Sequence, residues 1–434
     1  MKKVFGLFLA TTLVVSTLLT GCSKSAEGGA ESAAPAETTE APDAAETEGG
    51  EATENVAAAD KIVIFQSKVE ISDQLEACAA AYQEETGVEV EVWGTTGDDY
   101  FQQLKTKLAN NQGPTVFSLQ PGAESEQIKA YLADLSDMEL VSKVADGMAN
   151  VIDGKTVGIP YTVEGFGMVY NKDLIDPATV NSTDAFATML ADQKAAGVNG
   201  FGLSQESYFL IGHILNTPFA LQENPEDFVA KTIAGEVKLS ETPEFQEFAK
   251  LYAAVRENSY NPLEVNYDKE CGDFATGKSA SIHQGNWCAG MFTDYDVTFD
   301  MGMMALPIAG NDKLAVSVPA AWYVNSQATP EEIQAGKDFI NWLYTSETGK
   351  NYLMNEFGFI PVVEGMTNEN LDVLSQEVAK FTEEGKTISW PMNKWPAGFV
   401  DVYLVPIAEE FFTTDMSETD FLIAIENAFV EAGK

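Results

Sequence analysis

The chain has 434 residues, of which 67 are acidic and 25 are basic, so its formal charge is −42. Its 45% hydrophobic content is enough for real cores, and its length suits two domains of ordinary size. Such a negative charge repels phosphate backbones, so we expect no nucleic-acid partner. The chain has four cysteines without a CxxC pair and only two histidines, His213 and His283. It therefore predicts no metal site, no cofactor and no small disulfide scaffold.

Residues 1–21 have the pattern of a secretory signal peptide. Two lysines precede an apolar stretch at 4–19, which is too short to span a bilayer comfortably. The segment ends in Leu19-Thr20-Gly21-Cys22, which resembles the lipobox of bacterial lipoproteins, where cleavage precedes a cysteine that receives a diacylglycerol. We therefore expect a lipidated Cys22 as the new N-terminus, and no membrane contact other than this anchor. The alternative is a plain signal peptide followed by an incidental cysteine.

The residues that follow, 22–59, are predicted to be a disordered acidic linker. After Cys22 they are mainly Ala, Glu, Thr, Gly, Ser and Pro, with no aromatic side chain. Such a segment cannot bury enough apolar surface to offset the entropy of ordering. Its acidic side chains repel one another, so we expect an extended tether.

The folded part begins near residue 60 and alternates apolar strands with amphipathic helices. Strands are predicted at 62–65, 88–92 and 115–119, and helices at 75–82 and 101–108. Gly87 ends the first helix and Gly113-Pro114 follows the second. This order predicts an α/β fold with a parallel sheet and right-handed crossovers.

Two later helices carry clear start signals. Ser182 is positioned to cap a helix that buries Phe186 and Leu190 and ends near Gly197. The sequence Thr329-Pro330-Glu331-Glu332 is a capping box with proline at the first helical position. Both patterns predict helices that pack against a core.

Residues 272–279 match the letters of a phosphate-binding loop, but we reject that interpretation. The loop works only where it follows a strand and opens a helix, because the helix N-terminus then faces the phosphate. Here the preceding residues 267–274 have a helical pattern, and 280–283 have the pattern of a short strand. The order of elements is therefore the reverse of the one that the chemistry needs.

Aromatic residues near glycine or proline suggest a binding site. Trp287 follows Gly285-Asn286, and Trp322, Trp390 and Trp395 also lie close to Pro or Gly. For each tryptophan alone, burial in a core remains the alternative. As a set they fit a sugar, which needs aromatic surfaces for its flat C–H faces and polar side chains for its hydroxyls.

Several motifs in this order resemble the extracellular solute-binding proteins of carbohydrate ABC importers, the family that includes maltose-binding protein. The most specific stretch is 154–160 leading to 169–174, which matches the family's first crossing between lobes. Residues 274–280 leading to 284–287 match its aromatic, glycine, lysine, strand and tryptophan run, and 358–361 a late signature. The sequence departs from the family at Gln120-Pro121, which replaces an expected aromatic residue.

The resemblance implies a two-lobe fold of the periplasmic-binding-protein type II, with discontinuous lobes joined by a hinge. We expect the N-terminal lobe to contain 60–163 and 308–345, and the C-terminal lobe to contain 164–307 and 346–434. The ligand would bind between the lobes, and closure about the hinge would let both lobes contact it.

The resemblance also implies a set of ligand-binding residues. By position it assigns sugar contacts to Lys68, Glu164, Glu206, Tyr208, Trp287 and Trp395, and the set of tryptophans near Pro or Gly adds Trp322. No residue is expected to be catalytic.

The function implied is that of a monomeric lipoprotein on the outer face of the bacterial cell membrane. It would capture a sugar or oligosaccharide and deliver it to the permease subunits of an ABC importer. Two alternatives stay open: a surface-anchored glycan hydrolase, and a binding protein for another solute such as a polyamine. The sequence also leaves open whether Cys271 and Cys288 form a disulfide.

Overall fold

The computed structural model describes residues 59–94 and 99–434, all of which belong to one compact unit. The predicted signal peptide, the lipidated Cys22 and the acidic linker lie outside the described residues, apart from residue 59. In the two described ranges, no helix combines the length and the apolar character that crossing a membrane requires.

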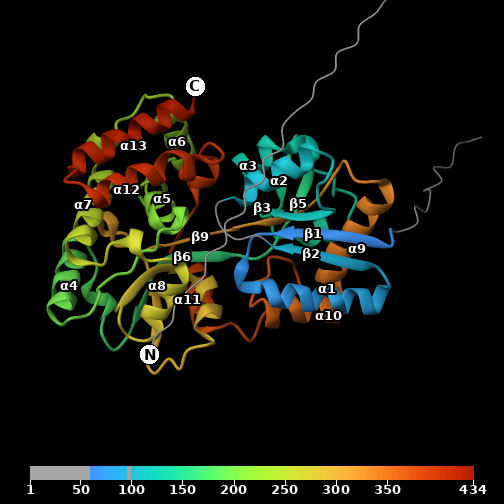
Figure 1. Cartoon of the computed structure of the whole chain (residues 1–434), viewed down its shortest axis with the longest axis horizontal. Helices are drawn as coiled ribbons and strands as arrows, with labels where there is room; N and C mark the ends of the chain where they lie inside the picture. Colours follow the sequence, from blue (N-terminus) through green and yellow to red (C-terminus); the bar gives the residue numbers. More distant parts are fainter. Residues whose placement is uncertain (1–58, 95–98) are drawn as a thin grey trace, which may run out of the picture. The chain divides into compact units, whose positions relative to one another are not determined.

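The strands of the described residues form two sheets (Figure 1). The first sheet has the order β2-β1-β3-β10-β5-β4, and the second has the order β11-β9-β6-β7 with β8 paired to β6. Their bounds are β1 Lys61–Gln66, β2 Glu89–Gly94, β3 Val116–Leu119, β4 Asn150–Ile152, β5 Lys155–Pro160, β6 Glu164–Asn171, β7 Ser281–Gly285, β8 Met301–Met304, β9 Leu314–Ser317, β10 Ala321–Val324 and β11 Thr387–Ile388.

The first sheet is mixed, so the expectation of a parallel sheet is only partly right. Strand β1 runs parallel to β2 and β3, as predicted. Strand β10 is antiparallel to both β3 and β5. The chain reaches β10 directly from β9 of the second sheet and not through a helix that packs on the first sheet. The parallel direction that a helical crossover imposes therefore does not apply to β10.

Five helices accompany the first sheet and eight accompany the second in the described ranges. The first group is α1 Ser72–Thr86, α2 Tyr100–Ala109, α3 Ala123–Gln127, α9 Pro330–Thr345 and α10 Glu347–Asn351. The second group is α4 Thr183–Ala195, α5 His213–Ala220, α6 Pro225–Ile233, α7 Pro243–Asn258, α8 Tyr267–Ala275, α11 Val373–Glu383, α12 Val405–Thr413 and α13 Glu418–Ala432.

The predicted helix signals are confirmed. Gly87 follows α1 with a φ of 81°, a conformation that glycine adopts without strain. The Ser182 side chain caps α4 by accepting from the N–H of Ala185. Thr329 and Glu332 form the reciprocal capping box of α9.

Period-two alternation divides the first sheet's side chains between two cores. Ile62, Ile64 and Trp322 pack in a cluster with α1 and α9. Phe65 and Tyr323 pack in another cluster with α2. Both faces of the sheet are therefore covered, as a sheet with parallel strands requires.

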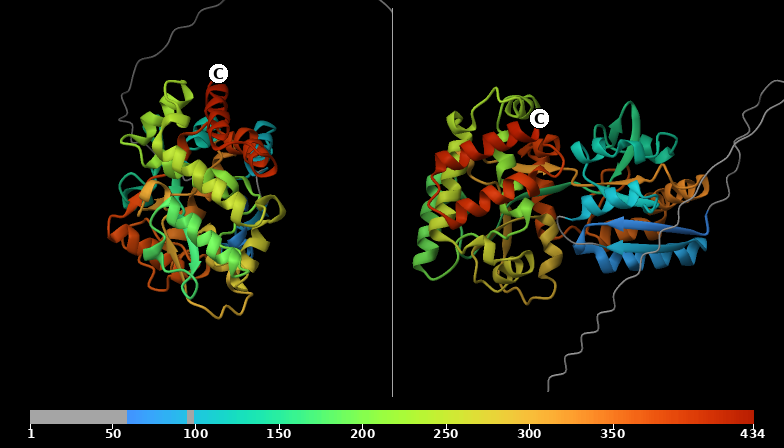
Figure 2. Two further views of the ribbon diagram at one scale, coloured as in Figure 1. Left: turned by 90° about the vertical axis from the view of Figure 1, so that its left-hand side faces the viewer. Right: turned by 45° about the horizontal axis from the view of Figure 1, so that its top comes forward.

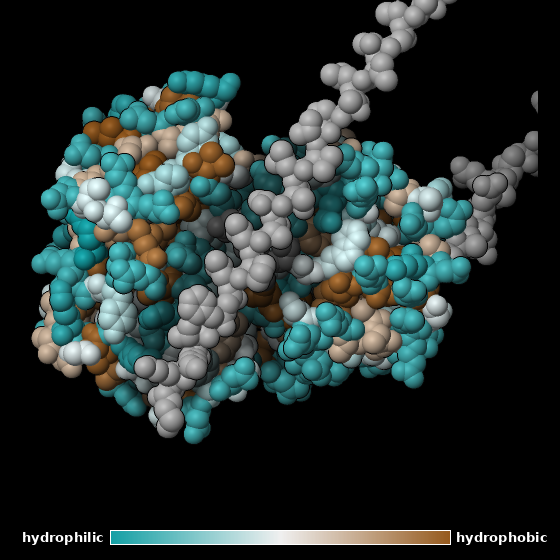
Figure 3. Space-filling view, in the orientation of Figure 1, coloured by the Kyte–Doolittle hydropathy of each residue, from teal (hydrophilic) through white to brown (hydrophobic). Residues whose placement is uncertain are grey.

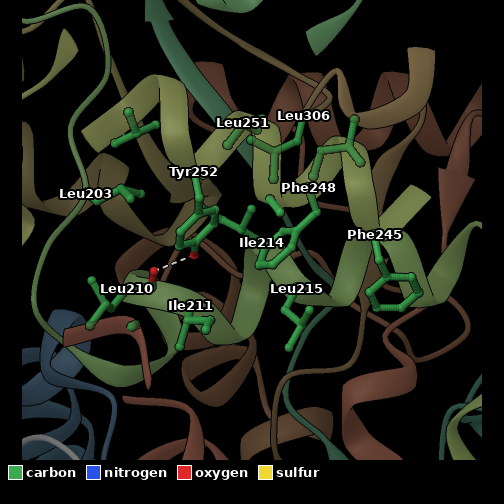
Figure 4. Packing of buried hydrophobic residues seen from close by; sticks show 14 of the residues in the cluster. Leu203, Leu210, Ile211, Ile214, Leu215, Phe245, Phe248, Leu251, Tyr252 and Leu306 are labelled. Atoms are coloured by element: carbon green, nitrogen blue, oxygen red, sulfur yellow. Dashed lines mark hydrogen bonds between the residues drawn. The ribbon is translucent and has the colours of Figure 1, made fainter. Parts of the chain in front are cut away.

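The second sheet also separates two cores, one on each side of β6. Phe166, Met168 and Tyr170 face the larger cluster, whereas Val169 faces the cluster that contains residues of α8 and α11. Figure 4 shows the larger cluster, in which the hydroxyl of Tyr252 donates to the carbonyl oxygen of Leu210 at 2.6 Å. In Figure 2 the C-terminal helices α12 and α13, in red, lie beside the helices that enclose this core.

Three connections join the two sheets in the described residues: 161–163 from β5 to β6, 318–320 from β9 to β10, and 352–372 from α10 to α11. Val163 and Ile360 form a β-bridge between two of them. The structure differs from two expected lobe assignments. Strand β9, expected in the first lobe, pairs with β6 in the second sheet, and α10, expected in the second lobe, packs on α9 and α1. A four-residue strand and a short helix do not reveal their partners through local pattern.

The rejected phosphate loop has the element order that the sequence analysis expected. Helix α8 ends at Ala275 and β7 begins at Ser281, so a helix precedes the motif and a strand follows it. No helix N-terminus therefore faces a loop at 272–279.

Cys271 and Cys288 are free thiols in the structure, and both are buried in the cluster that contains residues of α8 and η8 (Asn286–Phe292). Cys78 is also free and buried, on α1. Burial raises the pKa of Cys78 to about 12 and raises those of the other two thiols. All three therefore behave as apolar core residues at neutral pH.

Gly167 provides a test of this packing. A Cβ at Gly167 would lie 2.3 Å from the carbonyl oxygen of Met304 and 2.9 Å from Cδ1 of Leu314. We predict that Gly167→Ala lowers the free energy of unfolding by about 1 to 3 kcal/mol, because the neighbouring strand must move. Chemical denaturation measures the change. Gly290→Ala is the control, since a Cβ there meets nothing within 4 Å, and equal losses in both variants would contradict the packing.

Candidate functional site

A cavity of about 480 Å³ lies between residues of the two sheets. Its walls come from the segments after β1, β3 and β5, from α2 and α3, and from four short helical segments. These are η5 (Tyr208–Gly212), η8, η11 (Pro391–Lys394, with the adjoining Trp390) and η12 (Val400–Leu404). The volume falls in the range of small-molecule binding sites. Figure 3 shows mostly hydrophilic residues on the surface of the described chain in this view.

A buried ion pair joins the two sides of the cavity. Lys68, just after β1, places its ammonium 2.7 Å from Oε1 of Glu164, the first residue of β6. The carboxylate of Glu70 is 3.9 Å from the same ammonium. Burial opposes the charge on Lys68, but the two carboxylates outweigh it and raise the pKa of Lys68. Burial raises the pKa of Glu164, and Lys68 limits that rise.

Trp287 lines the cavity in an orientation that two neighbours fix. Its indole N–H donates to Oε1 of Gln284 at 2.8 Å, and Gln284 donates to the buried Glu270 at 2.6 Å. The ring folds back over Gly285, where a Cβ would lie 2.2 Å from a ring carbon. The ammonium of Lys68 is 6.0 Å from the ring centroid. Glycine at 285 therefore allows the indole to lie across the end of β7.

Other rings extend this aromatic wall. The His213 ring centroid lies 5.4 Å from Trp287, 5.6 Å from Tyr208 and 6.1 Å from Trp390. Phe209 stacks near Trp287 at 6.0 Å with an interplanar angle of 19°. All of these residues line the cavity. Of these rings, those of Trp287, Tyr208 and Phe209 are partly exposed, whereas those of His213 and Trp390 are buried.

His213 is neutral at physiological pH. Burial and the neighbouring His283 lower its pKa well below the usual value, and its ring stacks on Phe166 at 4.3 Å. The sequence analysis did not assign His213 to the site, because it considered histidine only as a metal ligand. Trp390 was noted there as a cleft aromatic, but it was not assigned to the site either. The signal in the sequence that could have assigned Trp390 to the site is the adjacent Pro391. Trp322 and Trp395 also lie close to a proline, so this signal does not distinguish Trp390 from them.

The structure brings four of the seven predicted ligand contacts to the cavity. Lys68, Glu164, Tyr208 and Trp287 line it. These residues come from the segment after β1, from β6, from η5 and from η8, which are far apart in sequence.

The other three predictions need correction. Trp322 is fully buried on β10 and packs on Tyr161 at 4.2 Å. Trp395 is 2% exposed and packs against Phe219 and other rings of the larger core. Glu206 lies outside the cavity wall, where its Oε1 accepts from the N–H of Tyr267 at the start of α8. Each has a structural reason for its position: the two indoles fill cores, and the carboxylate satisfies a helix N–H.

Four carboxyl groups outside the predicted set also line the cavity, those of Glu70, Asp99, Glu124 and Asp401. Glu124 lies in the first turn of α3, and Asp401 lies on η12 of the opposite side. Burial and the charge of Asp401 raise the pKa of Glu124 to about 7, while backbone donation at Gln120 and the charge of Lys105 act in the opposite direction. Glu124 is therefore partly protonated at neutral pH.

This raised pKa predicts a pH-dependent stability. Between its usual pKa of 4.5 and about 7, folded Glu124 holds a proton that the unfolded chain has lost. The free energy of unfolding therefore falls as the pH rises through this window. We predict that Glu124→Gln gains on the order of 1 kcal/mol relative to the wild type between pH 5 and pH 8. Denaturation at both pH values tests this, with the exposed Glu126→Gln as control. The prediction is contradicted if the difference in free energy of unfolding between Glu124→Gln and the wild type is the same at pH 5 and at pH 8.

Comparison with known proteins shows the family to which this chain belongs. Residues 77–383 match the family model described as bacterial extracellular solute-binding protein. The galactooligosaccharide-binding protein of Bacillus subtilis (strain 168) is 24% identical over 356 residues, which cover 77% of this chain and 80% of the relative. A maltooligosaccharide ABC transporter solute-binding lipoprotein of Streptococcus pneumoniae (strain ATCC BAA-255 / R6) is 24% identical over 294 residues, covering 64% and 66%.

Solved structures share the fold. The solute-binding protein RafE in complex with raffinose superposes with a TM-score of 0.72 at 20% identity, covering 86% of this chain and 100% of that one. A chitin oligosaccharide binding protein gives 0.73 at 19% identity, covering 86% and 99%. The two-lobe α/β fold is thus confirmed. Since the family model spans more than half of the sequence, the chain belongs to the bacterial extracellular solute-binding proteins.

Proposed function

We propose that this protein binds an oligosaccharide in the cavity between its two sheets and delivers it, chemically unaltered, to the permease of an ABC importer. The observation that carries this proposal is that the aromatic wall of Trp287, Tyr208 and Trp390 lines the same cavity as the Lys68–Glu164 pair. Ring faces suit the apolar C–H surfaces of a sugar, and charged groups suit its hydroxyls. The names of the relatives, which refer to galacto- and maltooligosaccharides, support the same ligand class.

The proposed lobes follow the two sheets. The first contains β1–β5, β10 and α10, and the second contains β6–β9 and β11. The connections at 161–163, 318–320 and 352–372 would act as the hinge. A sugar that contacts both lobes favours the closed form, because its differential affinity shifts the equilibrium between forms.

The protein is proposed to act outside the cell as a monomer that is anchored through a lipid on Cys22. The lipobox at 19–22 supports the anchor, as does the printed description of the streptococcal relative as a lipoprotein.

A substitution at Trp287 tests the binding function. We predict that Trp287→Ala weakens oligosaccharide binding by roughly tenfold or more, because the stacking surface is lost while its neighbours stay in place. Titration calorimetry against saccharides chosen by a thermal-shift screen measures this effect. Trp342→Ala, on α9 outside the cavity wall, is the matched control and keeps the wild-type affinity. Normal affinity in Trp287→Ala would remove this ring from the site. Recovery of cleaved saccharide after long incubation would instead indicate a hydrolase.

A second substitution tests the anchor. We predict that Cys22→Ala moves the protein from the membrane fraction to the soluble fraction, because the thiol that would carry the lipid is absent. Fractionation and immunoblotting of cells measure this distribution. The variant Ser23→Ala is the control and remains with the membrane. Equal membrane retention of Cys22→Ala would show that another segment holds the protein there.

A further inference from the structure

The cavity is closed on one side by a side-chain bridge centred on Gln120. This residue follows β3, and its Nε2 donates to Oδ1 of Asn393 on η11 at 2.7 Å. Its Oε1 accepts from the hydroxyl of Tyr208 on η5 at 3.3 Å. The Gln120 side-chain amide, which follows a strand of the first sheet, therefore contacts both η11 and η5, which belong to the part of the chain around the second sheet. Gln120 is partly buried, and an amide whose donor and acceptor are both used is held in one orientation.

The backbone two residues after Gln120 also lies close to Asn393. Gly122 has a φ of 110°, which favours glycine, and a Cβ there would lie 2.2 Å from the carbonyl oxygen of Asn393. The loop after β3 thus approaches η11 to a distance that no other residue at 122 would allow. The two segments are therefore in contact through their backbones as well as through the Gln120 side chain.

A small second chamber of about 10 Å³ lies beyond this bridge. It shares Gln120, Glu124, Tyr208, Met392 and Gly398 with the main cavity, and none of Lys68, Glu70 and Trp287. Gln120 and Tyr208, which are hydrogen-bonded to each other, therefore lie where the main cavity adjoins the chamber, on the side away from the ion pair. The chamber walls are otherwise formed by residues of 392–400 and by Ala123.

A second polar bridge lies beside the ion pair. The hydroxyl of Tyr267 on α8 donates to Oε1 of Glu70 at 3.0 Å, and Glu70 also faces the ammonium of Lys68. Between the two bridges lie the rings of Trp287, His213 and Tyr208, with consecutive centroids 5.4 and 5.6 Å apart. Tyr208 contacts Gln120 at one end of this row of rings, and the ammonium of Lys68 lies 6.0 Å from the Trp287 ring centroid at the other end.

We propose that Gln120 sets the maximum length of the bound saccharide, so that the cavity selects short oligosaccharides held whole rather than an internal stretch of a longer chain. A longer chain must displace the Gln120 amide and break its hydrogen bonds to Asn393 and Tyr208. Specificity against longer ligands thus comes from a built obstacle. This inference rests on the proposed oligosaccharide-binding function and identifies the ligand class within it.

Titration calorimetry with homologous saccharides tests the proposal. The probes are maltooligosaccharides and galactooligosaccharides from disaccharide to hexasaccharide, with wild type and Gln120→Ala compared at each length. We expect the wild-type affinity to drop at least tenfold once the chain exceeds a limiting length. In Gln120→Ala the drop moves to a longer saccharide, because the side chain that bridges this end of the main cavity is removed. The ratio of affinities for long and short members is the readout, so a uniform loss of affinity does not imitate the effect.

Two further variants complete the test. Asn393→Ala leaves Gln120 in place but removes its acceptor, and we expect a shift of the limit in the same direction. Gln112→Ala, an exposed glutamine outside the cavity wall, keeps the wild-type length profile. Thermal unfolding of every variant confirms folding. An identical limit in wild type, Gln120→Ala and Asn393→Ala, or no limit in the wild type, overturns the role of Gln120. Absence of binding to every saccharide overturns the proposed function, and this inference falls with it.

Discussion

The ion pair between Lys68 and Glu164 is the contact on which the cavity depends. It joins the segment after β1 to the first residue of β6, where the chain crosses between the sheets. Removing charges from water is costly, so such a pair adds little net stability, yet loss of one partner leaves the other buried and unpaired. The pair therefore fixes geometry more than it stabilises the fold. It holds Glu164 at the hinge and keeps the Lys68 ammonium near the face of Trp287.

The same logic extends along the aromatic wall. Trp287 is held by Gln284, which is held in turn by the buried Glu270, and Gly285 leaves room for the ring. A ring that is already fixed loses little conformational entropy when a sugar stacks on it. A sugar hydroxyl at the right position forms a hydrogen bond with a polar group such as Lys68 or Glu164, which favours binding. A sugar without that hydroxyl leaves the polar group unpaired, which disfavours binding. In the proposed binding site, rigid rings thus provide affinity, and the polar groups provide selectivity.

Local pattern predicted the helices well and the strand partners poorly. Caps such as Ser182 and Thr329 act on their own helix, so the sequence contains the whole cause. The partners of β9 and β10 depend on where distant segments meet, and no local pattern encodes that meeting. The tryptophans show the same limit. Trp390 and Trp395 flank η11 and both belong to the larger core cluster, yet only Trp390 also lines the main cavity. Only the surrounding packing separates them.

A crystal structure of the chain without its first 58 residues, in complex with a saccharide selected by thermal shift, tests the central claim most directly. The account predicts a sugar ring lying flat on the indole of Trp287, with a hydroxyl within hydrogen-bonding distance of Lys68 or Glu164 and contacts from both lobes. A saccharide bound elsewhere on the surface, with the Trp287 face unoccupied, would contradict it.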